Sequence, residues 1–137
     1  MRRTDLHGLA RARCDDAALL LENRRWSSAY YLAGYSIELG LKACIAKQIS
    51  KDTIPDKSII RDIYSHEFMK LVSLAGLRKE LSGAQNSDSD FAANWAIVSE
   101  WSPDTRYRVI SAAEAQYIVA AISDTEHGVL KWIKQYW

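Results

Sequence analysis

Two charged residues with helical spacing, Glu38 and Lys42, lie in the most apolar long segment of the chain. The segment from Trp26 to about Ile49 carries apolar residues on most faces of a helix, which predicts a helix inside a bundle rather than on its surface. A carboxylate on such a helix is costly to remove from water unless a cation pairs with it. Lys42 lies one turn on, so it can pair with Glu38 directly or contribute to an anion-binding site.

A second pair with catalytic chemistry is Arg61 and His66, which fits the pattern Arg-x(4)-His. An imidazole can move a proton when a ribose hydroxyl lies within hydrogen-bond reach, while the arginine holds the phosphate. A histidine near the N-terminus of a helix can equally make a local polar contact and nothing more. The spacing carries little information by itself, because a ribonuclease also needs a second proton-transfer group or strong electrostatic help.

The other two histidines, His7 and His127, lie alone on predicted helices. No group of His, Cys, Asp or Glu has the sequence spacing of a metal site. The chain also has neither a Gly-rich phosphate loop nor a nucleophile motif. The sequence therefore predicts neither a metal nor another cofactor.

Aromatic side chains gather in two segments. The first group consists of Phe91, Trp95 and Trp101. Aromatic residues at this spacing are predicted to belong to the core rather than to a base-stacking platform. Three tyrosines occupy more than one face of the Trp26–Ile49 helix, so at least one should approach the surface: Tyr30, Tyr31 and Tyr35. Aromatic surface on a small bundle is a suitable dimer contact.

Five helical segments must position these residues, and no strand pattern is present in the sequence. Their periodicity and capping signals place them at about 4–23, 27–49, 66–75, 91–101 and 111–137, with loops at 50–65 and 82–90. Ser111 and Glu114 form a capping box that opens the last helix, in which Gly128 is a weak point. The prediction is an all-α, single domain over 1–137: a four- to five-helix up-down bundle with two long antiparallel N-terminal helices and one long C-terminal helix.

The composition of the chain limits the cellular compartments and the classes of partner that can be expected for it. The chain has 137 residues and a net charge of +1, so no overall field draws it to nucleic acid or to an anionic membrane. Arginines in the N-terminal part are largely offset by nearby acids, which leaves nucleic-acid binding weakly supported. No signal peptide follows Met1 and no apolar run reaches the roughly 18 residues of a membrane span, so the prediction is a cytoplasmic protein. Cys14 and Cys44 are expected to be small buried hydrophobes.

Three segments, taken in order, resemble the HEPN domain, a family of small helical bundles linked to nucleotide binding. Residues 29–42 resemble the second-helix pattern of a small residue, Gly, an aromatic, Glu, an apolar residue and Lys. Ser65-His66 and the apolar residues after it resemble the third helix. Residues 101–107, which end in Arg106-Tyr107, resemble the Arg-Tyr motif before the last helix.

The resemblance implies one of two branches. One contains metal-independent ribonucleases, often toxins, with an Arg-x(4–6)-His motif at the start of the last long helix. Counted from Arg106 or Arg108, the positions for that histidine hold Ser111, Ala112, Ala113, Glu114 and Ala115. The other branch resembles the helical substrate-binding domain of aminoglycoside nucleotidyltransferases; many of its members are non-catalytic and work beside a separate nucleotidyltransferase chain. The missing histidine favours this second branch.

The resemblance also implies that Glu38 faces Arg106, and a bidentate guanidinium is a good partner for a carboxylate on an apolar helix. We therefore predict a Glu38–Arg106 pair inside the bundle with Tyr107 beside it, although a buried pair that only fixes the packing register is equally compatible. The predicted ligand-binding residues are Arg106, Tyr107, Glu38 and Lys42.

The resulting interpretation is a non-catalytic HEPN-like module that binds a nucleotide or other phosphorylated ligand. It is expected to form a homodimer and to work with a nucleotidyltransferase, in a toxin–antitoxin or defence setting. The alternatives are a metal-independent endoribonuclease that uses Arg61 and His66, and a purely structural assembly protein. An enzyme needs His66 open to solvent beside an arginine across a cleft, whereas a binding module can leave His66 far from Arg106.

Overall fold

The computed structural model of the chain describes residues 1–49 and 54–137. Within these residues the protein is all-helical, as predicted, and holds no strand. The elements in chain order are α1 (Arg3–Glu22), α2 (Trp26–Gln48), α3 (Lys57–Ile63), α4 (Phe68–Leu74), α5 (Arg78–Ser87), α6 (Ser89–Ser99), the 3₁₀ helix η1 (Pro103–Tyr107), α7 (Ala112–Ser123) and α8 (Val129–Lys134).

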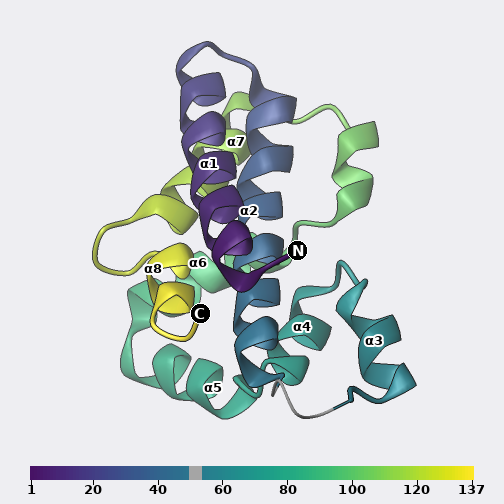
Figure 1. The fold of residues 1–137 in the computed structure, drawn as a ribbon. Coiled ribbons are helices and arrows are strands. Elements are labelled where there is room, and N and C mark those ends of the chain that lie inside the picture. Colours follow the sequence, from purple (N-terminus) through teal and green to yellow (C-terminus); the bar gives the residue numbers. More distant parts are fainter. Residues whose placement is uncertain (50–53) are drawn as a thin grey trace.

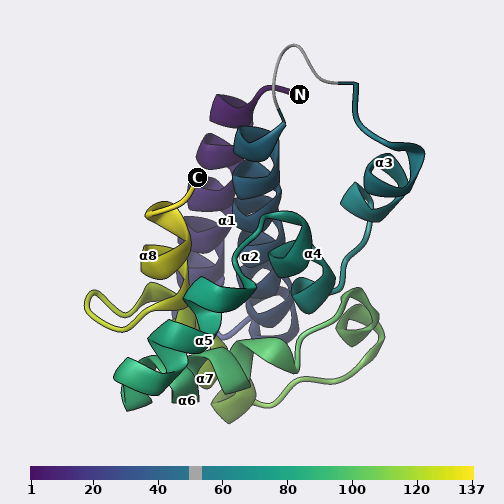
Figure 2. The ribbon, with the colours of Figure 1, turned by 90° about the horizontal axis from the view of Figure 1, so that it is seen from below.

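Helix α2 is the centre of the fold. It lies antiparallel to α1, to which the short turn at Asn23–Arg25 joins it, and it also packs against α4, α7, α8 and η1 (Figure 1, Figure 2). Thirteen of its 23 residues are buried, among them Ala33, Ile37, Leu41, Cys44 and Ile45. The two long antiparallel N-terminal helices, and the position of the second one inside the fold, are therefore confirmed. A helix buried on so many sides can hold a charged side chain only where a neighbour supplies a partner.

The long C-terminal helix was predicted wrongly. The chain forms two helices there, α7 and α8, separated by a turn over 124–128. Asp124 ends α7, and its carboxylate accepts the backbone N–H groups of Glu126 and His127 at 2.8 and 2.7 Å. Gly128 follows in a place where a side chain would meet the backbone oxygens of Ile122 and Asp124. Gly128, predicted as a weak point inside one helix, therefore follows a complete break between two helices. The sequence did not indicate the break because the apolar residues keep their helical spacing across the turn.

Two predicted loops contain helices, so the predicted total of four to five helices is also wrong. Helix α5 covers most of the 82–90 loop, and it buries Leu81 although the rest of its sequence is polar. Helix α3 lies inside the 50–65 loop and begins where Asp56 accepts the backbone N–H of Ser58; residues 50–53 of that loop lie outside the described residues. Short polar helices of this kind leave little periodic signal in a sequence.

Other predicted boundaries are confirmed. The capping box of Ser111 and Glu114 opens α7, with both reciprocal hydrogen bonds present. Gly76, with a φ of +71°, follows the end of α4.

Cys44 is buried and Cys14 half-buried, and burial raises the pKa of the Cys44 thiol to about 11. Across the described residues, no helix combines the length and the apolar character needed to cross a membrane.

Candidate functional site

Glu38, in the middle of α2, is only 2% exposed and has a cation-forming partner on each carboxylate oxygen. Its Oε2 accepts from Lys42 Nζ at 3.2 Å, which confirms the pairing one helical turn apart. Its Oε1 lies 2.6 Å from Nδ1 of His66. In the described part of the chain, Glu38 makes no ion pair with Arg106, so the predicted Glu38–Arg106 pair is wrong. The place expected for the guanidinium is taken by an imidazole.

His66 reaches Glu38 because α4 packs against α2 just after it. Phe68, the first residue of α4, is buried against Trp95 and Trp101, which fixes the preceding segment over the middle of α2. The side chain of Ser65 accepts the backbone N–H of Glu67 at 3.1 Å and shapes the approach to the helix. The His66 side chain is 56% exposed. Among the described residues its second ring nitrogen, Nε2, has no hydrogen-bond partner, so it is free to meet a ligand.

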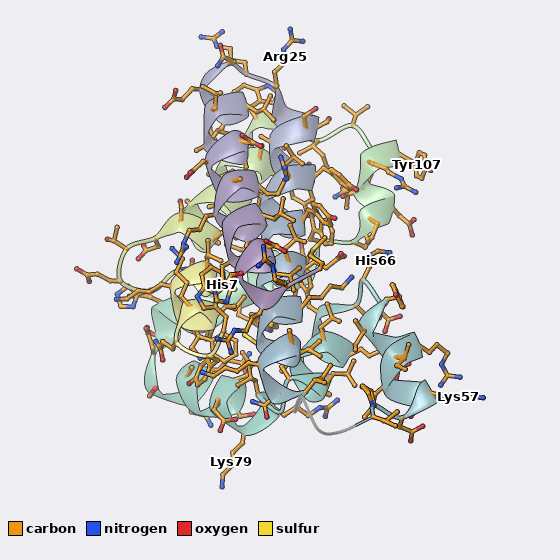
Figure 3. The ribbon with its side chains drawn as sticks, in the orientation of Figure 1. His7, Arg25, Lys57, His66, Lys79 and Tyr107 are labelled. Carbon is orange, nitrogen blue, oxygen red and sulfur yellow. The ribbon has the colours of Figure 1, made fainter. Side chains whose placement is uncertain are left out.

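A cavity of about 460 Å³ opens beside this histidine, and Arg106 lies in its wall. It is lined by α2, by the segment before α4 and by the Trp101–Arg106 segment, through Tyr31, Tyr35, Glu38, Ser65, His66, Glu67, Trp101, Pro103, Asp104 and Arg106. In Figure 3, the labelled His66 and Tyr107 both lie on the opposite side of α2 from α8. We call this cavity the His66 pocket.

Aromatic rings form one wall of the His66 pocket. Trp101 is 4% exposed and stacks on Phe68, with ring centroids 5.3 Å apart and planes 4° apart. Tyr31 is half-buried, and its ring centroid lies 6.0 Å from that of Trp101 and 6.2 Å from that of Tyr35. Burial, followed by the charge of Glu38, raises the pKa of Tyr35, so its hydroxyl stays a neutral hydrogen-bond donor. The Trp101 Nε1 atom is buried without a partner among the described residues.

The charges of the His66 pocket are mixed. Arg106 is exposed, and its guanidinium lies 4.9 Å from the ring centre of Tyr107. Glu38 is already paired, but the exposed carboxylates of Glu67 and Asp104 also line the cavity. The pocket therefore offers one permanent cation and one imidazole against two carboxylates at its rim. Such a site suits a ligand with a single phosphate better than one with several.

No protein-family model, curated protein or solved structure matches this chain. The resemblance to the HEPN family therefore rests on the residues quoted for it.

The structure sorts the predicted site residues into three groups. Glu38, Arg106 and His66 meet at one cavity. Lys42 and Tyr107 do not line the cavity. Lys42 pairs with Glu38, and the ring of Tyr107 packs against the Arg106 guanidinium. Arg61 belongs to α3, where its side chain is 79% exposed and lies 3.6 Å from Asp62. The Arg61–His66 pairing is therefore replaced by His66 with Arg106.

Sequence reasoning missed the contact between Glu38 and His66 and the place of two tyrosines in the pocket wall. The tyrosines do confirm that part of this aromatic set approaches the surface, since Tyr31 and Tyr35 are half-buried while Tyr30 is buried. The aromatic cluster was predicted as core, and its members Phe91, Trp95 and Trp101 are buried. The sequence did hold a hint of the Glu38–His66 contact, because the two residues lie in the first and second of the three segments that carry the family resemblance.

His127 is not alone as predicted. Asp88, Asp90 and His127 offer ligand atoms that lie within 4.8 Å of one another, a grouping that could hold a metal ion. The residues are far apart in sequence, which is why spacing did not reveal them. Asp88 caps α6 through one oxygen and lies 2.7 Å from His127 Nδ1 through the other. This contact lowers the pKa of Asp88 and raises that of His127, so the pair also acts as an ionic link between the 124–128 turn and α6.

Proposed function

We propose that this chain is a binding module whose His66 pocket takes a ligand with one phosphate, such as a nucleoside monophosphate or a phosphodiester. The observation that supports it is the presence of Arg106 and of a histidine oriented by a buried carboxylate in the wall of one cavity. Guanidinium and imidazole N–H groups make strong, charge-assisted hydrogen bonds to phosphate oxygens. The buried Glu38 holds the imidazole in a fixed orientation through its contact with Nδ1 at 2.6 Å.

The shape of the pocket supports a nucleotide over a bare phosphate. A cavity of about 460 Å³ is within the range of small-molecule sites. Tyr31 and Tyr35 present aromatic surface beside Arg106, and bases stack on such rings. Glu67 and Asp104 at the rim oppose additional negative charge, so a monophosphate should bind at least as well as a triphosphate.

Calorimetric titration of the purified protein with 5′-AMP, adenosine and ATP tests this proposal. We expect AMP to bind more tightly than adenosine, with no gain for ATP. Arg106→Ala should weaken AMP binding about tenfold or more, because it removes a charge-assisted contact. Arg61→Ala is the matched control, since Arg61 is also exposed but lies outside the pocket. Equal affinities for the wild type and Arg106→Ala would contradict the proposal, and the absence of any binding would favour the structural assembly alternative.

Three further features of the proposed function are carried by the family resemblance. They are a homodimer, a nucleotidyltransferase partner chain and a cytoplasmic, toxin–antitoxin or defence setting. The mixed charge of the pocket gives no independent support for nucleic acid as the main partner. Light scattering coupled to size-exclusion chromatography measures the oligomeric state directly, and a mass of one chain at micromolar concentration would exclude a stable homodimer.

Metal-independent cleavage of RNA is the second candidate, and one observation favours it. His66 is open to solvent, oriented by Glu38 and beside an arginine across a cavity, which is the arrangement an acid–base catalyst needs. The arginine concerned is Arg106 rather than Arg61. Cleavage of labelled single-stranded RNA in EDTA is the test, with His66→Ala, Arg106→Ala and Arg61→Ala compared. Activity lost in the first two variants and kept in the third would establish the enzyme; no cleavage by the wild type would exclude it.

A further inference from the structure

The three histidines of this chain all lie in the part that the structure describes, and their ring nitrogens are in very different surroundings. The His7 ring stacks on Trp137, with centroids 4.4 Å apart, and its Nε2 is buried without a partner. In His127, Nδ1 is 2.7 Å from Asp88, and Nε2 lies 3.7 Å from Asp90 and 3.6 Å from Glu126. Neither Nε2 atom suits an incoming anion, since one is covered and the other is surrounded by carboxylates.

His66 differs from both of them. Its Nδ1 donates to the Glu38 carboxylate at 2.6 Å, so in the neutral ring the proton lies on Nδ1 and Nε2 carries the lone pair. The side chain is 56% exposed, and it shares its cavity with Arg106. A histidine with an unpaired ring nitrogen in a cavity that also holds a guanidinium can act as a nucleophile as well as a base.

We propose that Nε2 of His66 is a phosphorylation site, which accepts a phosphoryl group from a small donor of the phosphoramidate class. The proposal rests on the proposed function, since the same pocket must first hold the phosphoryl group of the donor. Arg106 supplies the cation that offsets the charge of the phosphoryl oxygens. Glu38 supplies the opposite charge on the far side of the ring.

The transfer balances without any oxidant or reductant. The lone pair of Nε2 attacks phosphorus in zwitterionic phosphoramidate, the N–P bond of the donor breaks, and ammonia leaves with that electron pair. A new bond joins Nε2 to phosphorus. The Nδ1 proton remains between the ring and Glu38, so the positive charge that develops on the imidazole is paired with the buried carboxylate. One imidazole is sufficient for this step, whereas cleavage of RNA requires two proton transfers.

The modification would regulate the pocket. A phosphoryl group on Nε2 occupies the space beside Arg106 that the phosphate of a free ligand needs. Phosphorylated protein should therefore lose affinity for AMP until the phosphoramidate bond is hydrolysed.

The test is incubation of the folded protein with potassium phosphoramidate. ³¹P NMR detects phosphohistidine, and peptide mass spectrometry at alkaline pH gives the labelling rate of each histidine. His127 is the internal control, because it is also a histidine bonded to a carboxylate through Nδ1. We expect His66 to be labelled about tenfold faster than His127, and Arg106→Ala to remove most of that advantage. Glu38→Gln should also slow labelling of His66, with circular dichroism confirming that the variant is folded.

Labelling of His66 no faster than that of His127 would overturn the proposal, and so would an undiminished rate in Arg106→Ala. These outcomes are separate from the test of the proposed function. AMP binding that depends on Arg106, together with slow labelling of His66, would leave the binding module standing and refute phosphorylation alone. AMP binding that is independent of Arg106 would refute the binding function itself.

Discussion

The close approach of Trp101 to Gly34 leads to a sharp prediction, because it joins the core of α2 to the wall of the His66 pocket. A methyl group added at Gly34 would come closer than 3.0 Å to three atoms of Trp101: Cγ, Cδ1 and Cδ2. These atoms lie at the root of the indole, so rotation of the ring cannot clear them. The ring is also held by Phe68 on one side and Tyr31 on another.

The magnitude for Gly34→Ala follows from two opposing terms. Overpacking of a close-packed core costs about 1–3 kcal/mol, and a ring that cannot turn away favours the upper end. Alanine in a helix interior restores about 1 kcal/mol relative to glycine. We expect a net loss of about 2 kcal/mol in the free energy of unfolding, which corresponds to a Tm lower by roughly 6–10 °C for a domain of this size.

Gly8→Ala is the matched control. Gly8 also lies inside a helix, but nothing would contact its new methyl group within 4 Å. This variant should gain about 0.5–1 kcal/mol. Urea unfolding followed by circular dichroism compares the two variants with the wild type. In a Trp101→Ala background, Gly34→Ala should change from destabilising to stabilising, because its obstacle is gone. A Gly34→Ala protein as stable as the wild type would refute the close packing of Trp101 on α2.

Three further substitutions test the caps and links of α6, α7 and α8. Ser111→Ala should lower the free energy of unfolding by about 1 kcal/mol, measured by urea unfolding, because it removes the N-cap of α7; no change would mean that the capping box is unimportant. Gly128→Ala should lower the Tm in a thermal scan by more than the Ser111 variant does, because its methyl group would meet backbone oxygens that cannot move independently. The pKa of His127 is raised chiefly by its hydrogen bond to Asp88, so the stability it contributes is present below about pH 6.5 and is lost as the pH rises through the raised value. Urea unfolding at about pH 5.5 and pH 9 should therefore show a pH-dependent loss in the wild type that is smaller in His127→Gln, and equal losses would contradict the link.

The sequence was a good guide to α1 and α2, and a poor guide to the short helices. The central helix could be predicted because its length and its apolar faces leave no other arrangement for residues such as Ile37 and Leu41. Helices α3 and α5 could not, because α3 buries no residue and α5 buries Leu81 alone. The break between α7 and α8 was hidden for a different reason. Ile122 and Val129 keep a helical spacing across a turn in which the Asp124 carboxylate accepts two backbone N–H groups.

At the candidate site too, contacts within one helix could be predicted from the sequence, whereas contacts between segments far apart in the chain could not. Physical reasoning on one helix correctly required a partner for Glu38, and the local partner Lys42 followed from spacing alone. The choice between Arg106 and His66 could not be made from the sequence, because it depends on how the start of α4 sits on α2. That placement is decided by the packing of Phe68 against two tryptophans, which no spacing rule encodes.

The replacement of the expected arginine by a histidine changes what the pocket can do. A buried Glu38–Arg106 pair would have neutralised the one permanent cation in the cavity wall and left a structural element. With His66 and Lys42 as the partners of Glu38, Arg106 stays exposed at the cavity, and the buried carboxylate instead orients an imidazole whose other nitrogen is free. A permanent cation and an oriented imidazole are what phosphate recognition, proton transfer and phosphoryl transfer all require. The three differ in the second group that each needs, so the comparison of His66 with Arg106 variants in binding, cleavage and labelling assays separates them.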